Sequence, residues 1–254
     1  MTDHPATRSR KIVERFFPEV AVSGFSHVDG SVGFYSQIAA RLKPTDQVLD
    51  FGAGRGEPIM DDPVPYRRAL ANLQGRCAHV EGCDVDPVVL TNPFLDSARI
   101  IKISEPLPYQ DASFDMIVSR HVFEHVEDPA WMAQELLRVT KPGGWICAVT
   151  PNSWGYIATA ARMIPNWLHV RSLKRIQPER KAEDVFPTKY RMNTKWALKR
   201  WFGDHANIYA YLASSEPAYH FNSYFIFGMF KVLHKLLPEA LQTTLFIFIR
   251  KHNV

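Results

Sequence analysis

The chain has 254 residues, of which 46% are hydrophobic and 22% charged, so it has ample material for a folded core and is not of the disordered, collagen-like or coiled-coil classes. Its three cysteines form no CxxC pair and no zinc-spaced cluster with histidine, which excludes a disulfide framework and favours reduced thiols. The N-terminal residues lack the apolar run of a signal peptide and no stretch of about 18 uncharged apolar residues occurs, so we expect a soluble cytoplasmic protein.

Short apolar runs alternate with amphipathic stretches over the first 151 residues. A helix is expected over 31–43, where apolar residues recur at helical spacing, and Asp128 followed by Pro129 is a helix start signal. The other expected elements are helices at 64–74, after Pro87 and at 129–140, and strands at 47–51, 78–83, 99–101, 114–119 and 145–150. Because strands that alternate with helices form a parallel sheet covered on both faces, the fold class is α/β.

Beyond residue 151 the pattern is less regular, since prolines interrupt the stretch 151–192. We expect a helix at 193–202, strands at 206–213 and 243–249, and an unusually apolar helix at 220–237. That last helix is expected to be buried between the final two strands. The alternative is a helix that lies on a membrane surface, with its basic residues against anionic lipid.

Positive charge is concentrated in residues 151–200. This segment holds eleven Lys and Arg against three acidic residues, a net charge of +8, so the rest of the chain carries −4 of the formal total of +4. Such a concentration favours an anionic partner or substrate, and a solvated helical face is the alternative.

A glycine-rich turn after the first expected strand is the main chemical signal. The spacing is Asp50-x-Gly52-x-Gly54-x-Gly56, and glycines at the carboxyl end of a parallel strand allow a ligand to approach backbone amides closely. A second acid, Asp84, ends the next strand, where a carboxylate can accept two hydrogen bonds from ribose hydroxyls. A nicotinamide dinucleotide site is disfavoured, because Glu57 occupies the place of the third glycine in that fingerprint.

Five segments in order carry recognisable motifs. Residues 48–56 (VLDFGAGRG) and 82–86 (GCDVD) resemble the first and second motifs of class I S-adenosylmethionine-dependent methyltransferases. The stretches 107–118, 124–126 and 136–144 are similar to the segments around the fourth strand. The resemblance covers about residues 46–151.

The resemblance implies a doubly wound, mostly parallel seven-stranded sheet of the Rossmann-like methyltransferase type, with a helical C-terminal elaboration and an antiparallel last strand. It implies S-adenosyl-L-methionine as cofactor and S-adenosyl-L-homocysteine as product. We accordingly divide the chain into an N-terminal extension (1–30), a cofactor-binding core (31–151) and a C-terminal part (152–254) that completes the sheet and forms the acceptor site.

Positions that match the family motifs carry over as expected cofactor contacts. The resemblance implies that Asp50 and the turn hold the methionine portion, Asp84 the ribose and Val85 the adenine, with Arg120 and His121 beside the sulfonium. The full expected set is Asp50, Gly52, Ala53, Gly54, Gly56, Asp84, Val85, Glu105, Arg120 and His121. One departure is Ile103, which stands where many members have an adenine-binding Asp, so Ser104, Glu105 or backbone groups are expected to substitute.

Catalysis of methyl transfer requires near-attack geometry and, for a hydroxyl acceptor, a general base. His121, Glu124 and His125 are the candidates, and capping or bridging of the loop is the alternative role for each. The HxxEH spacing of these residues also matches a metalloprotease motif, but that motif needs a helix, whereas this one follows a strand. Some quinone-biosynthesis methyltransferases carry an acid-x-x-Glu-His cluster for a divalent cation. His121 replaces that acid, so we expect no metal.

The expected acceptor is a small molecule, a lipid or a glycan, with an anionic group as an option, and the expected reaction is O-methylation. Nucleic acid is disfavoured, because the Asn-Pro-Pro-Tyr type of motif and an appended RNA-binding module are absent from the sequence. The alternatives are a non-catalytic S-adenosylmethionine-binding regulator and an RNA or DNA methyltransferase. The expected location is the cytoplasm, with peripheral contact at the inner membrane face as an option, and the oligomeric state is left open.

Overall fold

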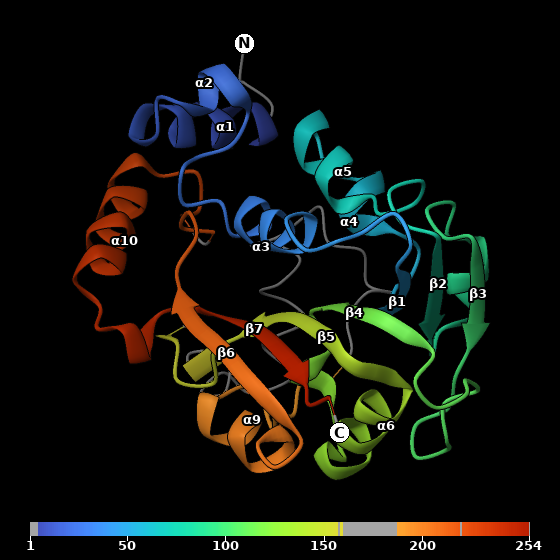
Figure 1. The fold of residues 1–254 in the computed structure, drawn as a ribbon. Helices are drawn as coiled ribbons and strands as arrows, with labels where there is room; N and C mark the ends of the chain where they lie inside the picture. Colours follow the sequence, from blue (N-terminus) through green and yellow to red (C-terminus); the bar gives the residue numbers. More distant parts are fainter. Residues whose placement is uncertain (1–4, 157, 160–186, 219, 254) are drawn as a thin grey trace.

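The computed structural model describes residues 5–156, 158–159, 187–218 and 220–253, which fold around one seven-stranded sheet (Figure 1). The strand order is β3-β2-β1-β4-β5-β7-β6, in which β7 is antiparallel to both of its neighbours and the other pairs are parallel. This confirms the predicted α/β class and the antiparallel last strand. The strands are β1 (Gln47–Phe51), β2 (His79–Asp84), β3 (Ser97–Ile100), β4 (Phe114–Arg120), β5 (Thr140–Pro151), β6 (Ala206–Ala213) and β7 (Thr244–Lys251).

Helices cover both faces of the sheet. The elements described are α1 (Pro5–Phe16), α2 (Val20–Ser23), α3 (Gly30–Ala39), α4 (Glu57–Met60), α5 (Pro65–Ala71), η1 (Pro87–Thr91), η2 (Phe123–His125), α6 (Pro129–Val139), α9 (Lys195–Phe202), α10 (Tyr224–Leu236) and η4 (Glu239–Leu241). Figure 1 shows α3 and α5 on one side of the sheet and α6 and α9 on the other. Residues 160–186, with most of the predicted basic segment, lie outside the described residues.

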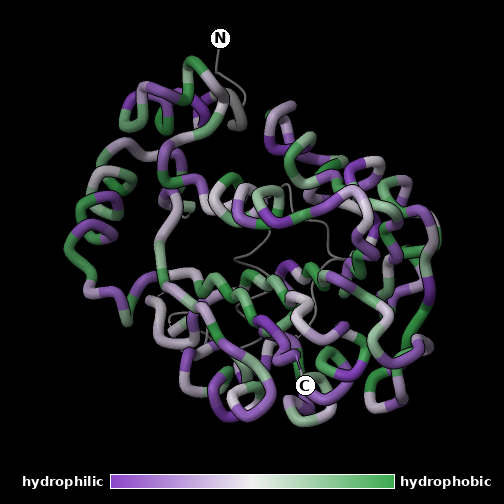
Figure 2. Tube along the Cα trace, viewed as in Figure 1, coloured by the Kyte–Doolittle hydropathy of each residue, from purple (hydrophilic) through white to green (hydrophobic). Residues whose placement is uncertain are grey.

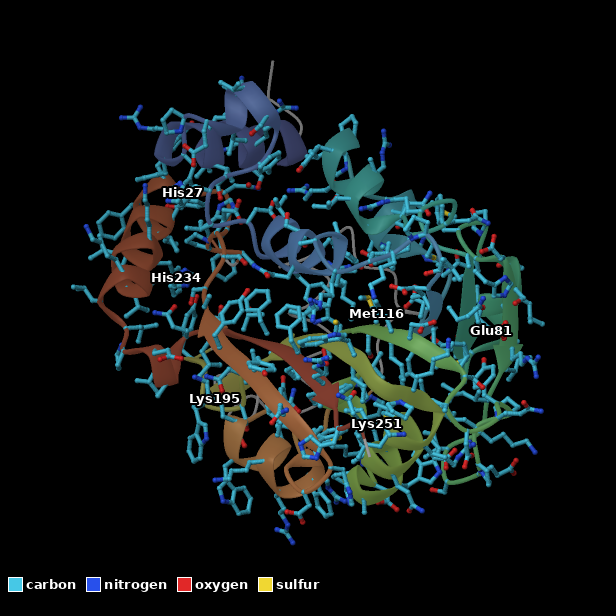
Figure 3. The ribbon with its side chains drawn as sticks, viewed as in Figure 1. His27, Glu81, Met116, Lys195, His234 and Lys251 are labelled. Atoms are coloured by element: carbon cyan, nitrogen blue, oxygen red, sulfur yellow. The ribbon has the colours of Figure 1, made fainter. Side chains whose placement is uncertain are left out.

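The strands are apolar on both sides because both faces of the sheet are buried. Alternate residues of β1 illustrate this, since Val48 packs with Phe34 and Ile38 of α3, whereas Leu49 packs in the core beneath α6 and α9. Met116 of β4, labelled in Figure 3, belongs to the first of these cores. The two cores together fix the sheet from both of its faces.

The boundary between α6 and β5 differs from the expectation. The sequence predicts the strand at 145–150, but β5 begins at Thr140, directly after α6 ends at Val139. α6 begins as predicted, with the Asp128 side chain accepting hydrogen bonds from the amides of Ala130 and Trp131 at 3.0 Å each. β5 thus includes residues 142–144, which the sequence leaves outside the strand.

The apolar helix α10 is not buried between the last two strands, so that expectation is wrong. α10 lies at the outside of the molecule beside α1 (Figures 1 and 2), and the described residues cover one face of it. That face presents Phe227, which is fully buried with Ile12, Phe17 and Val20 in a small separate cluster. Within the described residues, no helix is long and apolar enough to cross a membrane.

Two phenylalanines of α10 give a test of this docking. Phe227 is 0% exposed and stacks on Phe16 with 4.9 Å between ring centroids, whereas Phe225 is 81% exposed. We expect Phe227→Ala to lower the free energy of unfolding by about 3–5 kcal/mol, and Phe225→Ala to change it by less than about 0.5 kcal/mol. Urea unfolding of both variants measures the difference, and equal effects would mean that α10 does not pack on α1 as described.

Candidate active site

The candidate site lies at the carboxyl ends of β1, β2 and β4. The sheet order reverses between β1 and β4, which are neighbours although β2 and β3 separate them in the sequence. In open parallel sheets, ligands bind at this switch point, outside the carboxyl ends of the strands. The glycine turn follows β1, and Arg120 is the last residue of β4, directly before His121. The residues predicted to hold the methionine portion and those predicted to lie beside the sulfonium therefore come together here.

The glycine turn is bent back onto the end of β2. Gly52, Gly54 and Gly56 have φ of 79°, 47° and 80°, which residues with a side chain rarely adopt. The amide of Gly52 donates to the carbonyl of Cys83 at 2.8 Å, and the amide of Gly54 donates to Oδ2 of Asp84 at 2.9 Å. A Cβ on Gly52 would lie 2.2 Å from Cγ2 of Val122, so this glycine also allows the β4 loop to approach closely.

Asn92, which was not predicted, supports the turn from the other side. Its side-chain amide is buried and donates to the carbonyls of Ala53 and Gly54 at 3.2 Å each. Its Oδ1 accepts from the amide of Phe94 at 3.0 Å. A lone asparagine beyond a short 3₁₀ helix carries no sequence signal for this role, because the contact depends on the fold.

Asp84 receives backbone donors on both carboxylate oxygens. Besides the Gly54 bond, Oδ1 accepts from the amide of Asp86 at 3.0 Å. Each oxygen has a second lone pair, so the carboxylate retains acceptor capacity towards a ligand. Val85 follows with 40% of its surface exposed, as an apolar side chain at the same edge.

Asp50 lies in a cluster of charged and polar groups with Arg120, Glu57 and Tyr35. Burial, with the nearby Asp84 carboxylate, raises the pKa of Asp50 to about 7, and Arg120 opposes the shift. Arg120 also lies 3.6 Å from a carboxylate oxygen of Glu57. Burial raises the pKa of Tyr35 to about 12. Tyr35 was not among the predicted site residues, because its apolar neighbours placed it within an ordinary core-facing helix.

A cavity of about 140 Å³ opens beside this cluster. Among its lining residues are Ser31 and Tyr35 of α3, Glu57 of α4 and Arg120 at the end of β4. The helix α3 therefore contributes to the site as well as to the core.

His121 begins the loop after β4 in a strained conformation. Its φ of 56° lies in the left-handed region, which a non-glycine residue occupies only when its surroundings hold it there. Its amide donates to the carbonyl of Val149 at 2.9 Å, so the adjacent strand β5 fixes the backbone. The imidazole is about half exposed at the edge of the site.

A buried chain of polar groups continues from His121 into the protein. Nδ1 of His121 lies 3.3 Å from Oε1 of Glu124, whose Oε2 accepts from the Thr150 hydroxyl at 2.8 Å. The Thr150 hydroxyl accepts in turn from the side-chain amide of Asn193 at 2.6 Å. Burial would raise the pKa of Glu124, but the hydrogen bond and charge attraction from His121, with its other hydrogen bonds, lower it on balance.

Glu124 also anchors a segment that is distant in the sequence. Its backbone carbonyl accepts from the amides of Lys189 and Tyr190 at 2.6 and 3.0 Å. Thr150 and Asn193 were not predicted, since each is an ordinary polar residue until the fold brings it to Glu124. The carboxylate is therefore an ionised, fixed partner for the exposed imidazole.

Two predicted residues lie apart from the His121–Glu124 pair. Nδ1 of His125 donates to the carbonyl of Pro187 at 2.9 Å. Glu105 is exposed and lies 3.3 Å from the Lys102 ammonium, and Ile103 is 56% exposed in the same loop.

The HxxEH segment forms only the three-residue η2, and among the described residues no group of three or more His, Cys, Asp or Glu could hold a metal ion.

Comparison with known proteins gives a family model, described as a methyltransferase domain, that matches residues 32–206. A probable S-adenosylmethionine-dependent methyltransferase of Mycolicibacterium smegmatis is 46% identical over 120 residues, which cover 46% of this chain and 42% of the relative. The ubiquinone biosynthesis O-methyltransferase of Paracidovorax citrulli is 46% identical over 107 residues, which cover 42% of this chain and 44% of the relative. In both cases the match spans less than half of the relative's length.

A solved structure of a SAM-dependent methyltransferase from Thermotoga maritima has the same fold. Its TM-score is 0.53 at 13% sequence identity, and the alignment covers 96% of this chain and 99% of that one.

The raised pKa of Asp50 predicts a pH effect on stability. The pKa lies above its ordinary value of 3.8, so the folded state binds the proton more tightly than the unfolded state. The unfolding free energy contributed by this group therefore falls as the pH rises from about 4 to about 7. We expect the stability of Asp50→Asn relative to the wild type to increase by about 1–3 kcal/mol between about pH 5 and about pH 8.

Urea unfolding of both proteins without ligand measures this difference. Because the comparison is between two proteins at each pH, the titration of groups that do not interact with Asp50 cancels. A difference that stays constant with pH would contradict the assigned shift.

Proposed function

The chain belongs to the S-adenosylmethionine-dependent methyltransferases, and from this premise we propose that it methylates a hydroxyl oxygen of a small-molecule, lipid or glycan acceptor, with His121 as general base. The observation that carries the proposal is the His121–Glu124 pair at the end of β4, where the imidazole is exposed and the carboxylate is buried. The ubiquinone biosynthesis O-methyltransferase among the relatives supports an oxygen acceptor.

The residues at the site fit the cofactor. Its sulfonium and ammonium groups are cationic, and the site offers two carboxylates. Burial and the Asp84 carboxylate raise the pKa of Asp50, so a cation beside it would stabilise its ionised form. The space above Gly54 is open: a Cβ added there would have Oδ2 of Asp84 as its nearest neighbour, at 3.9 Å. A ligand can therefore approach the turn beside the Asp84 carboxylate, which retains free lone pairs. Asp50 and the glycine turn would hold the methionine portion, Asp84 the ribose hydroxyls and Val85 the adenine.

When bound, S-adenosylmethionine supplies an electrophilic methyl group, and in-line transfer leaves S-adenosylhomocysteine. The protein must place the acceptor oxygen in line and remove its proton. The Glu124 carboxylate accepts a hydrogen bond, so it selects the His121 tautomer with the proton on Nδ1. Nε2 is then left with its lone pair, at the exposed end of the ring, and can take the proton from an acceptor hydroxyl.

Glu124 has a positioning role in this proposal. It is 5% exposed and its carboxylate already accepts from the Thr150 hydroxyl. Glu124 therefore orients the imidazole and stabilises its protonated form, and it does not contact the acceptor. His125 holds the Pro187 carbonyl and is not needed as a base.

Replacement of Asp84 tests the ribose contact. We expect Asp84→Ala to weaken binding of S-adenosylhomocysteine by about 1–3 kcal/mol, because the carboxylate is lost both as a ligand partner and as the acceptor for the Gly54 amide. Calorimetric titration measures the affinity. The matched control is Asp86→Asn, two residues away, which should leave the affinity within about twofold. Unchanged binding by Asp84→Ala would reject the ribose role.

Replacement of His121 tests the general base. We expect His121→Gln to lower kcat by about 10²-fold or more while the affinity for S-adenosylhomocysteine stays within about threefold. Glu124→Gln should cost at least about tenfold, since an amide donor at this position turns the imidazole into the wrong tautomer. Turnover is followed as methyl transfer from labelled S-adenosylmethionine to a panel of phenols, catechols, hydroquinones, hydroxylated lipids and glycans.

His125→Gln is the comparison variant, because an amide there can still donate to the Pro187 carbonyl. We expect its kcat to fall by about threefold or less. A loss at His125 equal to that at His121, or a methyl group found on nitrogen or carbon of the product, would count against the proposal.

A further inference from the structure

The helix α10 exposes a continuous apolar stripe. The stripe consists of Phe225, Met229, Val232 and Leu236, whose exposed fractions are 81%, 51%, 58% and 74%. Spacings of four, three and four residues place all of them on one side of a helix. The opposite side carries the buried Phe227, so the described parts of the chain cover the inner face of α10 and leave the stripe to solvent.

Basic side chains flank this stripe on the side of α1. Lys235 is exposed on α10, and the Arg15 guanidinium of α1 lies over the Tyr224 ring, 5.6 Å from its centroid. The Lys231 ammonium donates to the Phe16 carbonyl at 2.5 Å. α10 contains no acidic residue, and the one acid of α1, Glu14, already accepts from Arg10 at 2.8 Å. An apolar stripe with a positive flank is typical of helices that lie in a membrane interface.

The stripe and the candidate active site are at the same edge of the sheet. β6 runs in the direction of β5, because both are antiparallel to β7, so its carboxyl end shares the edge that carries the glycine turn. α10 follows that end. Three strand spacings of about 4.8 Å separate β6 from β4, so the strand that leads towards α10 lies on the order of 15 Å across the sheet from the strand that carries Arg120.

Hydrogen bonds connect the α10 segment to the cavity wall. His234 of α10, labelled in Figure 3, donates from Nδ1 to the Ser215 carbonyl at 3.1 Å. The Ser215 hydroxyl accepts from the amide of Gly30 at 3.1 Å, at the start of α3. The next residue, Ser31, lines the cavity with Arg120. The helix is thus fixed relative to the site.

We propose that α10 and the end of α1 bind the surface of a membrane that contains anionic lipid. The stripe enters the interface between headgroups and acyl chains, while Arg15 and Lys235 meet the lipid phosphates. The surface itself is independent of the reaction. Its consequence rests on the proposed function: the acceptor hydroxyl belongs to a molecule that partitions into the membrane and reaches His121 from the bilayer surface.

A second copy of this chain suits the stripe less well. A stable interface buries about 800 Å² on each partner, more than four side chains of one helix provide. A two-fold dimer through α10 would also bring two copies of the basic flank together. Anionic lipid is the partner that satisfies both the apolar and the charged groups.

Co-sedimentation of the full chain with vesicles tests the proposal without turnover. The vesicles are pure phosphatidylcholine, or phosphatidylcholine mixed with an equal part of phosphatidylglycerol. We expect the mixed vesicles to bind the protein more tightly and high salt to weaken that binding. Phe225→Ser combined with Leu236→Ser should weaken it by more than about tenfold, and Lys235→Gln by about fivefold.

The control is Leu90→Ser, an apolar side chain with 58% exposure on η1 beside β3, at the opposite end of the strand order. It should bind vesicles like the wild type. Titration with S-adenosylhomocysteine confirms that every variant is folded. The proposal is overturned if the wild type stays in the supernatant, or if the stripe variant binds vesicles normally. It is also overturned if light scattering shows the wild type as a dimer and the stripe variant as a monomer. Vesicle binding with no O-methylated product would overturn the proposed function alone.

Discussion

The hydrogen bond from the Gly54 amide to the Asp84 carboxylate holds the turn after β1 against the end of β2, and the geometry of the site depends on it. Three glycines with positive φ would otherwise leave this segment with many conformations to lose. Asn92 holds the carbonyl side of the same turn. The turn is therefore ordered before any ligand arrives, which reduces the entropy cost of binding.

A second constraint joins the end of β4 to the end of β5. Glu124 links His121 to Thr150 by its side chain and holds Lys189 and Tyr190 by its carbonyl. One residue thus contacts the exposed imidazole through its buried carboxylate and holds the returning chain through its backbone carbonyl. The left-handed backbone at His121 is maintained by this packing, and its strain is consistent with a role in function.

Local patterns predicted the elements with strong periodicity and the residues of the glycine turn. β1 and β6 have the predicted bounds, because their apolar runs end at clear turn signals. Asn92, Tyr35, Thr150 and Asn193 could not be predicted, since their partners lie far away in the sequence and only the fold brings them together. The burial of α10 was predicted wrongly for a related reason: hydrophobicity indicates that a surface prefers to leave water, but not whether this chain or another body covers it.

The place of α10 in the chain has a consequence for the evolution of this protein. The helix lies within the connection between β6 and β7, and the ladder between these strands closes at the pair Ala213 and Thr244. Because the two ends of the connection are neighbours, segments of very different length and character can be exchanged there without disturbing the sheet. The glycine turn after β1 lies on the other side of β4 from this connection and would not change. Lineages with this fold can therefore replace this connection while the glycine turn after β1 stays the same.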